Sequence, residues 1–270
     1  MSLPSPDPQS TVLITGASSG IGTELARQLG ARGHNLVLVA RRKERLEKLA
    51  KEIGKASGVD VDVRKADLSV QAQRTRLINA LREGERHVAG VCNNAGFSTY
   101  GKFQDLPLDT ELEEVRLNVL ALHELTGAFL DDMVRRRQGA ILNVASIAGF
   151  QPLPNQATYG ATKAFAVSFS EAIHTDLHGT GVSCTALCPG PVRTEFTEVA
   201  GMTDLDDTAP EFVWMQPGDV AKAGIDGMVK GKRIVFPSIT HQAVGLAGRF
   251  APRSVLLPLI ERFGSPSRNR

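Results

Sequence analysis

Two patterns of apolar residues alternate along this chain. Short runs rich in Val, Ile and Leu predict buried strands, and segments with apolar residues at helical spacing predict helices between them. The predicted strands cover residues 11–16, 35–40, 61–68, 88–96, 139–146, 182–190 and 232–237. The predicted helices cover residues 24–33, 42–55, 73–84, 110–137, 157–178 and 219–231. Mostly apolar strands that alternate with helices indicate a parallel sheet covered on both faces.

This alternation predicts an α/β fold, a single domain built on a doubly wound, Rossmann-like parallel sheet. Residues 11–240 contain no linker and no internal repeat that would divide them. Residues 1–10 are rich in Pro and Ser, and we expect them to form a disordered leader. Residues 241–270 form an apolar and basic C-terminal extension, which we expect to pack on the domain or at a subunit interface.

A glycine-rich stretch, TGASSGIG, lies between the first predicted strand and the first helix. Gly16 permits a sharp turn, Gly20 lets the backbone approach a ligand, and Gly22 lets the helix pack on the sheet. Glycines also make ordinary tight turns. After a strand and at the start of a helix, however, they form the pyrophosphate site of a dinucleotide.

The end of the second strand indicates which dinucleotide binds. NAD-binding folds of this kind usually carry an acidic residue there, but this chain has Ala40, Arg41 and Arg42. An arginine suits the 2′-phosphate of NADP(H), which a carboxylate would repel. The alternative is that the arginines begin a solvated helix. We predict NADP(H) as the cofactor, with Arg41 on the phosphate.

Tyr159 and Lys163 lie four residues apart in a predicted helix and therefore share one face. Taken alone, such a pair is most often a half-buried tyrosine beside a surface lysine, since residues four apart are neighbours in any helix. A phenol has a pKa of about 10, and a nearby positive charge favours the phenolate and lowers that pKa.

Together these motifs resemble the short-chain dehydrogenase/reductase family over about residues 10 to 237. The motifs follow one another in the family's order: TGASSGIG, DL at 67–68, NNAG at 93–96, Asn118, Ser146, YGATK at 159–163 and PGPVRT at 189–194. The resemblance implies a catalytic tetrad. Tyr159 would exchange a proton with the substrate, Lys163 would lower its pKa and Ser146 would bond the substrate oxygen, while Asn118 would hold a water for proton resupply.

The resemblance also implies the residues that hold the cofactor. Asp67 and Leu68 would contact the adenine, and the NNAG stretch would line the adenosine side. The residues around Pro189 would flank the nicotinamide. The predicted cofactor-binding residues are Gly16, Ser18, Ser19, Gly20, Ile21, Arg41, Asp67, Leu68, Asn94, Ala95, Gly96, Tyr159, Lys163, Pro189, Gly190, Val192 and Thr194.

Residues 194–217 follow the nicotinamide-flanking strand and are long enough for a substrate lid. Their apolar residues favour a lipophilic substrate, 3-oxoacyl or steroid-like, unless they form a surface flap that packs on the sheet edge. For residues 241–270 three roles compete: packing at a subunit interface, which is the simplest, an apolar wall over the substrate, or contact with a membrane surface. The apolar residues of these two segments are Phe196, Met202, Phe212, Trp214, Met215, Leu246, Phe250, Val255, Leu256, Leu257, Leu259, Ile260 and Phe263.

Composition narrows the classes of function. A net charge of +2 and 5% aromatic residues argue against nucleic-acid binding. The three cysteines form no Cys-x-x-Cys pair, so we predict neither a disulfide framework nor a metal site. The N-terminus resembles no signal peptide and no apolar stretch could span a bilayer. We therefore predict a reduced, cytoplasmic protein.

These observations predict an NADP(H)-dependent oxidoreductase that transfers a hydride between the nicotinamide and a ketone or secondary alcohol. The alternative is a catalytically silent dinucleotide-binding sensor or scaffold, which would have less need of the complete tetrad. A sugar-nucleotide epimerase is less consistent with the glycine spacing. The resemblance further implies a homodimer or homotetramer formed through the helices at 110–137 and 157–178. The substrate and the physiological direction are not encoded in these motifs.

Overall fold

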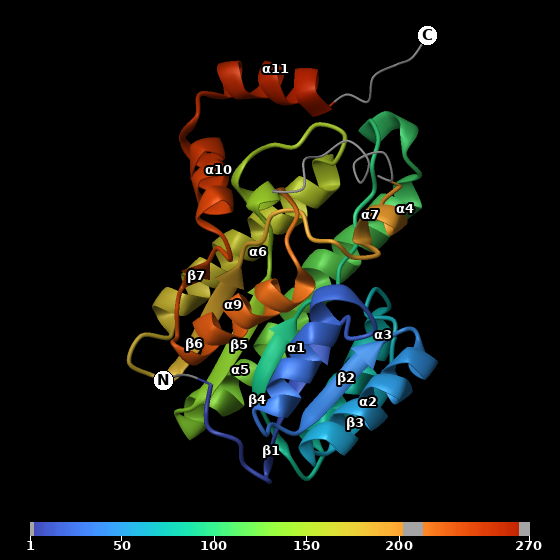
Figure 1. Cartoon of the computed structure of the whole chain (residues 1–270), viewed down its shortest axis with the longest axis vertical. Coiled ribbons are helices and arrows are strands. Elements are labelled where there is room, and N and C mark those ends of the chain that lie inside the picture. Colours follow the sequence, from blue (N-terminus) through green and yellow to red (C-terminus); the bar gives the residue numbers. More distant parts are fainter. Residues whose placement is uncertain (1–2, 202–212, 265–270) are drawn as a thin grey trace.

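The fold is a parallel sheet between two layers of helices (Figure 1). The computed structural model describes residues 3–201 and 213–264. Its seven strands are all parallel and lie in the order β3-β2-β1-β4-β5-β6-β7, which confirms the predicted fold class. The strands are β1 (Ser10–Thr15), β2 (Leu36–Ala40), β3 (Val61–Lys65), β4 (His87–Asn93), β5 (Gly139–Val144), β6 (Val182–Leu187) and β7 (Ile234–Val235).

The helices follow the strands in the predicted positions. One interruption was not predicted: the long helix around residue 120 contains a π-helical turn. The elements are α1 (Gly20–Ala31), α2 (Lys43–Ser57), α3 (Gln71–Arg82), η1 (Phe103–Asp105), α4 (Leu108–Val115), the π-helical η2 (Arg116–Ala121), α5 (Leu122–Arg136), η3 (Ile147–Phe150), α6 (Ala157–Asp176), α7 (Phe196–Val199), α9 (Pro217–Val229), α10 (Ile239–Phe250) and α11 (Arg253–Gly264).

The strands are apolar throughout because helices cover both faces of the sheet. Side chains of a strand alternate between faces, so Val12 and Ile14 pack with α1, α2 and α9, whereas Leu13 packs with α3 and α5. α6 packs over the β5–β6 part of the sheet. Large aliphatic side chains such as Leu13 and Ile14 are wholly buried, and each contributes about 1.5–3 kcal/mol to the stability of the fold.

The strand order reverses at β1, which pairs with β2 on one side and β4 on the other. Such a switch point opens a crevice at the carboxyl ends of the two strands. Here the two loops are joined through Thr15, whose hydroxyl oxygen accepts hydrogen bonds from the backbone N–H groups of Asn94 and Ala95, each at 3.0 Å. The topology therefore places the glycine loop beside the NNAG stretch.

Both ends of the described chain include residues that pack against the rest of the domain. Leu3 is buried in the core beside Val12, so residues 3–9 pack against the domain where a disordered leader was expected. At the other end, α10 packs against η3, and α11 follows it at the far end of the molecule (Figure 1). Within residues 3–201 and 213–264, no helix combines the length and apolar character needed to cross a bilayer.

Candidate active site

A cavity of about 580 Å³ opens at the carboxyl edge of the sheet. All of the predicted cofactor-binding residues line it, as do Arg42 and Ser146. Among the predicted catalytic residues, Asn118 does not line the cavity and lies buried behind it. The fold thus brings together residues as far apart in the sequence as Gly16 and Trp214.

The glycine loop has the geometry of a site for a phosphate-bearing ligand. Gly16 has φ +64°, and a side chain there would come within 2.9 Å of the Ala95 backbone. A Cβ at Gly22 would lie 2.3 Å from the Gly16 carbonyl oxygen, so only glycine allows this approach. α1 begins at Gly20 without a side-chain cap, which leaves its first N–H groups and positive dipole end for an anion. These features fit a dinucleotide pyrophosphate.

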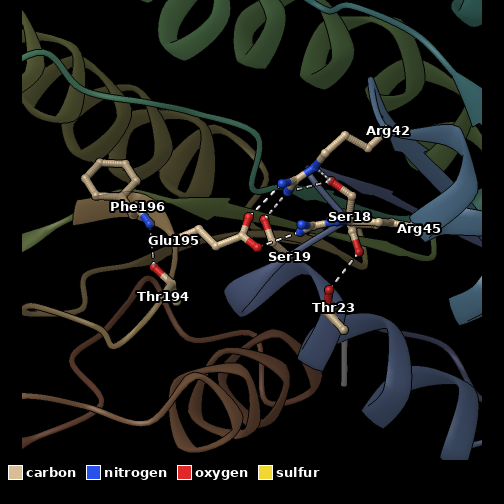
Figure 2. Close-up of polar contacts among 9 residues, drawn as sticks. Ser18, Ser19, Thr23, Arg42, Arg45, Thr194, Glu195 and Phe196 are labelled. Atoms are coloured by element: carbon tan, nitrogen blue, oxygen red, sulfur yellow. Dashed lines mark hydrogen bonds and ion pairs between the residues drawn. The ribbon is translucent and has the colours of Figure 1, made fainter. Parts of the chain in front are cut away.

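The arginines after β2 lie in different surroundings. Arg41 is 66% exposed and is 3.7 Å from the Glu113 carboxylate. Arg42 instead reaches the glycine loop, where its guanidinium donates to the hydroxyls of Ser18 at 3.2 Å and Ser19 at 2.7 Å (Figure 2). Both arginines line the cavity at the end of β2, and Arg42 joins Arg41 as a candidate cofactor contact.

Tyr159 and Lys163 both point toward the cavity from α6, as their spacing predicted. Lys163 is buried and its ammonium donates to the Val144 carbonyl oxygen at 2.8 Å, with the nitrogen 5.6 Å from the centre of the Tyr159 ring. Ser146 lies just beyond β5, where its hydroxyl oxygen accepts from the Ala148 N–H at 3.1 Å. The Ser146 side chain also interacts with the Tyr159 phenol, and this interaction favours the phenolate.

Desolvation changes the proton affinity of this pair. The protein around the Tyr159 hydroxyl removes water from it and raises its pKa to about 12, although the hydrogen bond with Ser146 opposes the shift. Burial lowers the pKa of Lys163 to about 8, while the Glu114 carboxylate opposes that shift. The net shift of the tyrosine pKa is therefore upward, opposite to the direction expected from Lys163, because desolvation is its largest cause. At neutral pH the phenol keeps its proton and is a proton donor.

Asn118 lies in the π-helical turn η2, a rare geometry that occurs mostly at functional sites. Its amide oxygen accepts from the Phe97 N–H at 3.2 Å, and its amide nitrogen donates to the Phe97 carbonyl at 2.9 Å and the Thr162 hydroxyl at 3.1 Å. Gly96 separates Asn118 from Lys163, since a Cβ there would lie 2.9 Å from Asn118 Oδ1 and 3.7 Å from Lys163 Nζ. Asn118 thus fixes the segment behind the lysine.

Two buried carboxylates behind Asn118 were not predicted. Thr99 lies between them: its hydroxyl donates to Glu111 at 2.6 Å, and its N–H donates to Glu114 at 3.3 Å. The Thr158 hydroxyl also donates to Glu111. Burial raises the pKa of Glu114 to about 7. Glutamates in a polar helical stretch resemble surface charges in sequence, so no pattern there indicated burial.

The rest of the cavity wall comes from η3, the start of α6 and the segment after β6. Phe196 lies with its ring centre 5.6 Å from that of Tyr159, and Trp214 packs under the Arg193 guanidinium at 5.2 Å. Met215 pairs its backbone with Val192. Met202 and Phe212 of the predicted lid lie outside the described residues. The residues on this side include Ile147, Gln151, Leu153, Gln156, Phe196, Val213 and Trp214.

Comparison with known proteins decides the family. A family model described as short chain dehydrogenase matches residues 10–204. The chain belongs to this short-chain dehydrogenase family. Sulfoacetaldehyde reductase 2 of Chromohalobacter salexigens is 37% identical to it over 220 residues, 78% of this chain and 85% of that protein. A very-long-chain 3-oxoacyl-CoA reductase of Anas platyrhynchos is 30% identical over 263 residues, 96% of this chain and 81% of the relative.

A solved structure supports the same family. The short-chain dehydrogenase from Sphingobium yanoikuyae, solved in complex with NADPH, is 35% identical, with a TM-score of 0.80 over 96% of this chain and 99% of that one. As a short-chain dehydrogenase, the protein is an oxidoreductase that acts on alcohol or carbonyl substrates. A nicotinamide dinucleotide is the cofactor typical of this family, and the glycine loop fits one.

Proposed function

We propose that this short-chain dehydrogenase interconverts a ketone and a secondary alcohol with NADP(H), acting on a lipophilic substrate. The observation that carries the proposal is the position of Tyr159. Its phenol lies at the cavity wall with Ser146 and the buried Lys163, on the same edge of the sheet as the glycine loop.

The proposed chemistry divides between the cofactor and the protein. The bound nicotinamide supplies or accepts the hydride. In the direction of reduction, Tyr159 Oη gives its proton to the carbonyl oxygen, and Ser146 Oγ donates a hydrogen bond to the same oxygen. The Lys163 ammonium then stabilises the phenolate that remains. Asn118 would hold a water for proton resupply behind Lys163, and its contacts with Phe97 and Thr162 position its side chain there.

Local charge supports the choice of NADP(H). The usual acidic residue is missing from the end of β2, because Ala40 is its last residue and Arg41 and Arg42 follow it. Arg42 is anchored at the glycine loop and Arg41 lines the same cavity, which places two positive charges beside the expected position of the adenosine ribose. The NADPH bound to the Sphingobium relative is consistent with this choice.

The wall opposite the glycine loop supports a lipophilic substrate. Ile147, Leu153, Phe196, Val213 and Trp214 present mainly carbon surface to the cavity. The relatives alone do not indicate the class of substrate, because the substrates in their names range from a small anionic aldehyde to a very-long-chain acyl thioester. The lining of this chain therefore carries the inference.

A substrate screen tests the proposal. Purified protein is mixed with NADPH and a panel of ketones of increasing apolar size, and the loss of NADPH absorbance is followed; the matching alcohols are tested with NADP⁺. We expect turnover that improves with apolar size. Tight NADPH binding without turnover on any member of the panel would favour the silent sensor instead. Turnover that is confined to small charged carbonyls would contradict the lipophilic assignment.

A further inference from the structure

One carboxylate is held by two arginines at the entrance to the proposed phosphate site. Glu195 accepts from Arg42 at 2.6 Å through Oε2 and from Arg45 at 2.6 Å through Oε1 (Figure 2). Both arginines come from the start of α2, whereas Glu195 comes from the segment after β6, about 150 residues later. These two contacts therefore join two distant parts of the cavity rim.

The arginine that holds Glu195 is also the one anchored at the glycine loop. Arg42 contacts Ser18, Ser19 and Glu195 at once, so its remaining donor capacity for another anion is small. A carboxylate and a phosphate bind the same N–H groups at the edge of a guanidinium through charge-assisted hydrogen bonds. Glu195 and a ribose 2′-phosphate would consequently compete for Arg42.

We propose that Glu195 is a latch, a carboxylate that occupies Arg42 and Arg45 until the 2′-phosphate of NADP(H) displaces it. The latch lowers the affinity for NADP(H) relative to NAD(H), and its release frees residues 196–201. This inference rests on the proposed preference for NADP(H). It adds that Glu195 limits the affinity for NADP(H), and that binding of the 2′-phosphate releases the residues after Glu195.

The surroundings of Glu195 support the latch. Hydrogen bonds from Arg45 and Arg42 hold the pKa of its carboxyl below the ordinary value, so the group is charged at neutral pH. The next residue, Phe196, packs its ring against that of Tyr159, and its N–H donates to the Thr194 hydroxyl at 3.2 Å. A displacement of Glu195 would therefore also move Phe196, which contacts the proposed catalytic tyrosine.

The competing role for Glu195 is structural: it could hold Arg42 in position for the phosphate. The geometry argues against this role because Arg42 already has two serine hydroxyls to orient it. The two roles predict opposite effects of Glu195→Gln. This variant keeps the shape of the side chain and removes only the charge, so it separates them cleanly.

The first test measures binding. Dissociation constants for NADPH, NADH and adenosine 2′,5′-bisphosphate are obtained by titration for wild type, Glu195→Gln and the control Glu198→Gln, which removes a charge from an exposed position of the same segment. Because the Glu195 side chain is 39% exposed, water screens its ion pairs. We expect Glu195→Gln to bind the two 2′-phosphate ligands about 3- to 10-fold more tightly, with NADH unchanged.

The second test measures the segment itself by hydrogen–deuterium exchange of residues 195–201. Adenosine 2′,5′-bisphosphate has no nicotinamide, so any effect on this segment comes through the phosphate end. We expect it to speed exchange there in wild type, whereas adenosine 5′-monophosphate should not. Glu195→Gln should exchange rapidly without any ligand.

The outcomes separate the latch from the cofactor preference. Equal wild-type affinity for NADPH and NADH would remove the proposed preference, while tighter NADPH binding by Glu195→Gln would still support the latch. A wild type that prefers NADPH, together with a variant whose affinity is unchanged or weaker, overturns the latch alone. If adenosine 2′,5′-bisphosphate does not change the rate of hydrogen–deuterium exchange at residues 195–201, the coupling of Glu195 to Phe196 is wrong.

Discussion

At the scale of single residues, desolvation is the largest influence on the pKa values of Tyr159 and Lys163. It raises the pKa of Tyr159 and lowers that of Lys163, so each favours its uncharged form. A protonated phenol is ready to act as an acid on a carbonyl oxygen. The reverse reaction needs the phenolate, which becomes more populated as the pH rises.

Tyr159→Phe should abolish this proton transfer and little else. The phenylalanine keeps the ring that packs against Phe196 but has no hydroxyl to give a proton or to bond Ser146. We expect kcat to fall by about 10²-fold or more, with NADPH affinity within about twofold of wild type. Steady-state kinetics on a substrate from the screen, combined with cofactor titration, provide the measurement. Wild-type turnover in this variant would remove Tyr159 from the mechanism.

Glu114 should make the stability of the protein depend on pH. Burial raises the pKa of its carboxyl from the ordinary 4.5 to about 7, with a contribution from the neighbouring Glu111 and an opposing one from Lys163. Between these values the folded state holds a proton that the unfolded state has released. Stability should therefore fall as the pH rises from about 4.5 to 7, by at most about 3 kcal/mol from this group.

The comparison of Glu114→Gln with wild type isolates that contribution. Urea unfolding at pH 5, 6, 7 and 8 should give a flatter stability profile for the variant, because glutamine does not titrate. Glu113→Gln, on the exposed side of the same helix, is the matched control and should run parallel to wild type. Parallel profiles for all three proteins would mean that Glu114 is not buried as described.

At the scale of elements, the sequence predicted the strands and helices well and their irregularities poorly. Apolar runs and helical spacing located the sheet and the helices because burial on both faces imposes those patterns. The π-helical turn at Asn118 leaves no such pattern, since it depends on contacts with Phe97 and Thr162, which come from other parts of the chain. Likewise, the pairing of Glu195 with Arg42 joins residues whose spacing in sequence carries no signal.

The C-terminal extension should affect the substrate more than the cofactor. His241 of α10 packs directly on Gly190, where a Cβ would lie 2.0 Å from the imidazole, and its Nε2 is 3.0 Å from the Val213 carbonyl oxygen. Deletion of residues 241–270 removes these contacts. We expect lower thermal stability and a changed substrate KM, with NADPH affinity less affected.

A shorter truncation is the control for that prediction. Deletion of residues 253–270 removes α11 but keeps α10 and its packing on η3, so KM should stay near the wild-type value. Co-sedimentation of wild type and both truncations with anionic vesicles tests the alternative that the extension contacts a membrane surface. Unchanged stability and kinetics in both truncations, with loss of binding to anionic vesicles, would show that the extension is a membrane tether.

At the scale of the whole molecule, apolar side chains are exposed on the helices through which we expect the protein to self-associate. Leu112 and Leu120 are 41% and 43% exposed, and on the neighbouring α6 the rings of Phe165 and Phe169 stack at 5.3 Å. Other apolar residues of the same helices, Leu122 and Phe129, face inward and are buried in the core. Sequence spacing could not separate these two faces because apolar residues occur on both.

We predict a dimer or tetramer through α4, α5 and α6. Light scattering at micromolar concentration should give at least twice the chain mass of 29.0 kDa. Phe169→Glu places a charge beside Phe165 and His123 and should shift the protein toward the monomer, since an unpaired charge in an apolar interface is costly. Phe250→Glu, at a 78% exposed position on α10, introduces the same charge elsewhere and should leave the mass unchanged. A wild-type mass of about 29 kDa would contradict the prediction, and dissociation by Phe250→Glu alone would move the interface to the C-terminal extension.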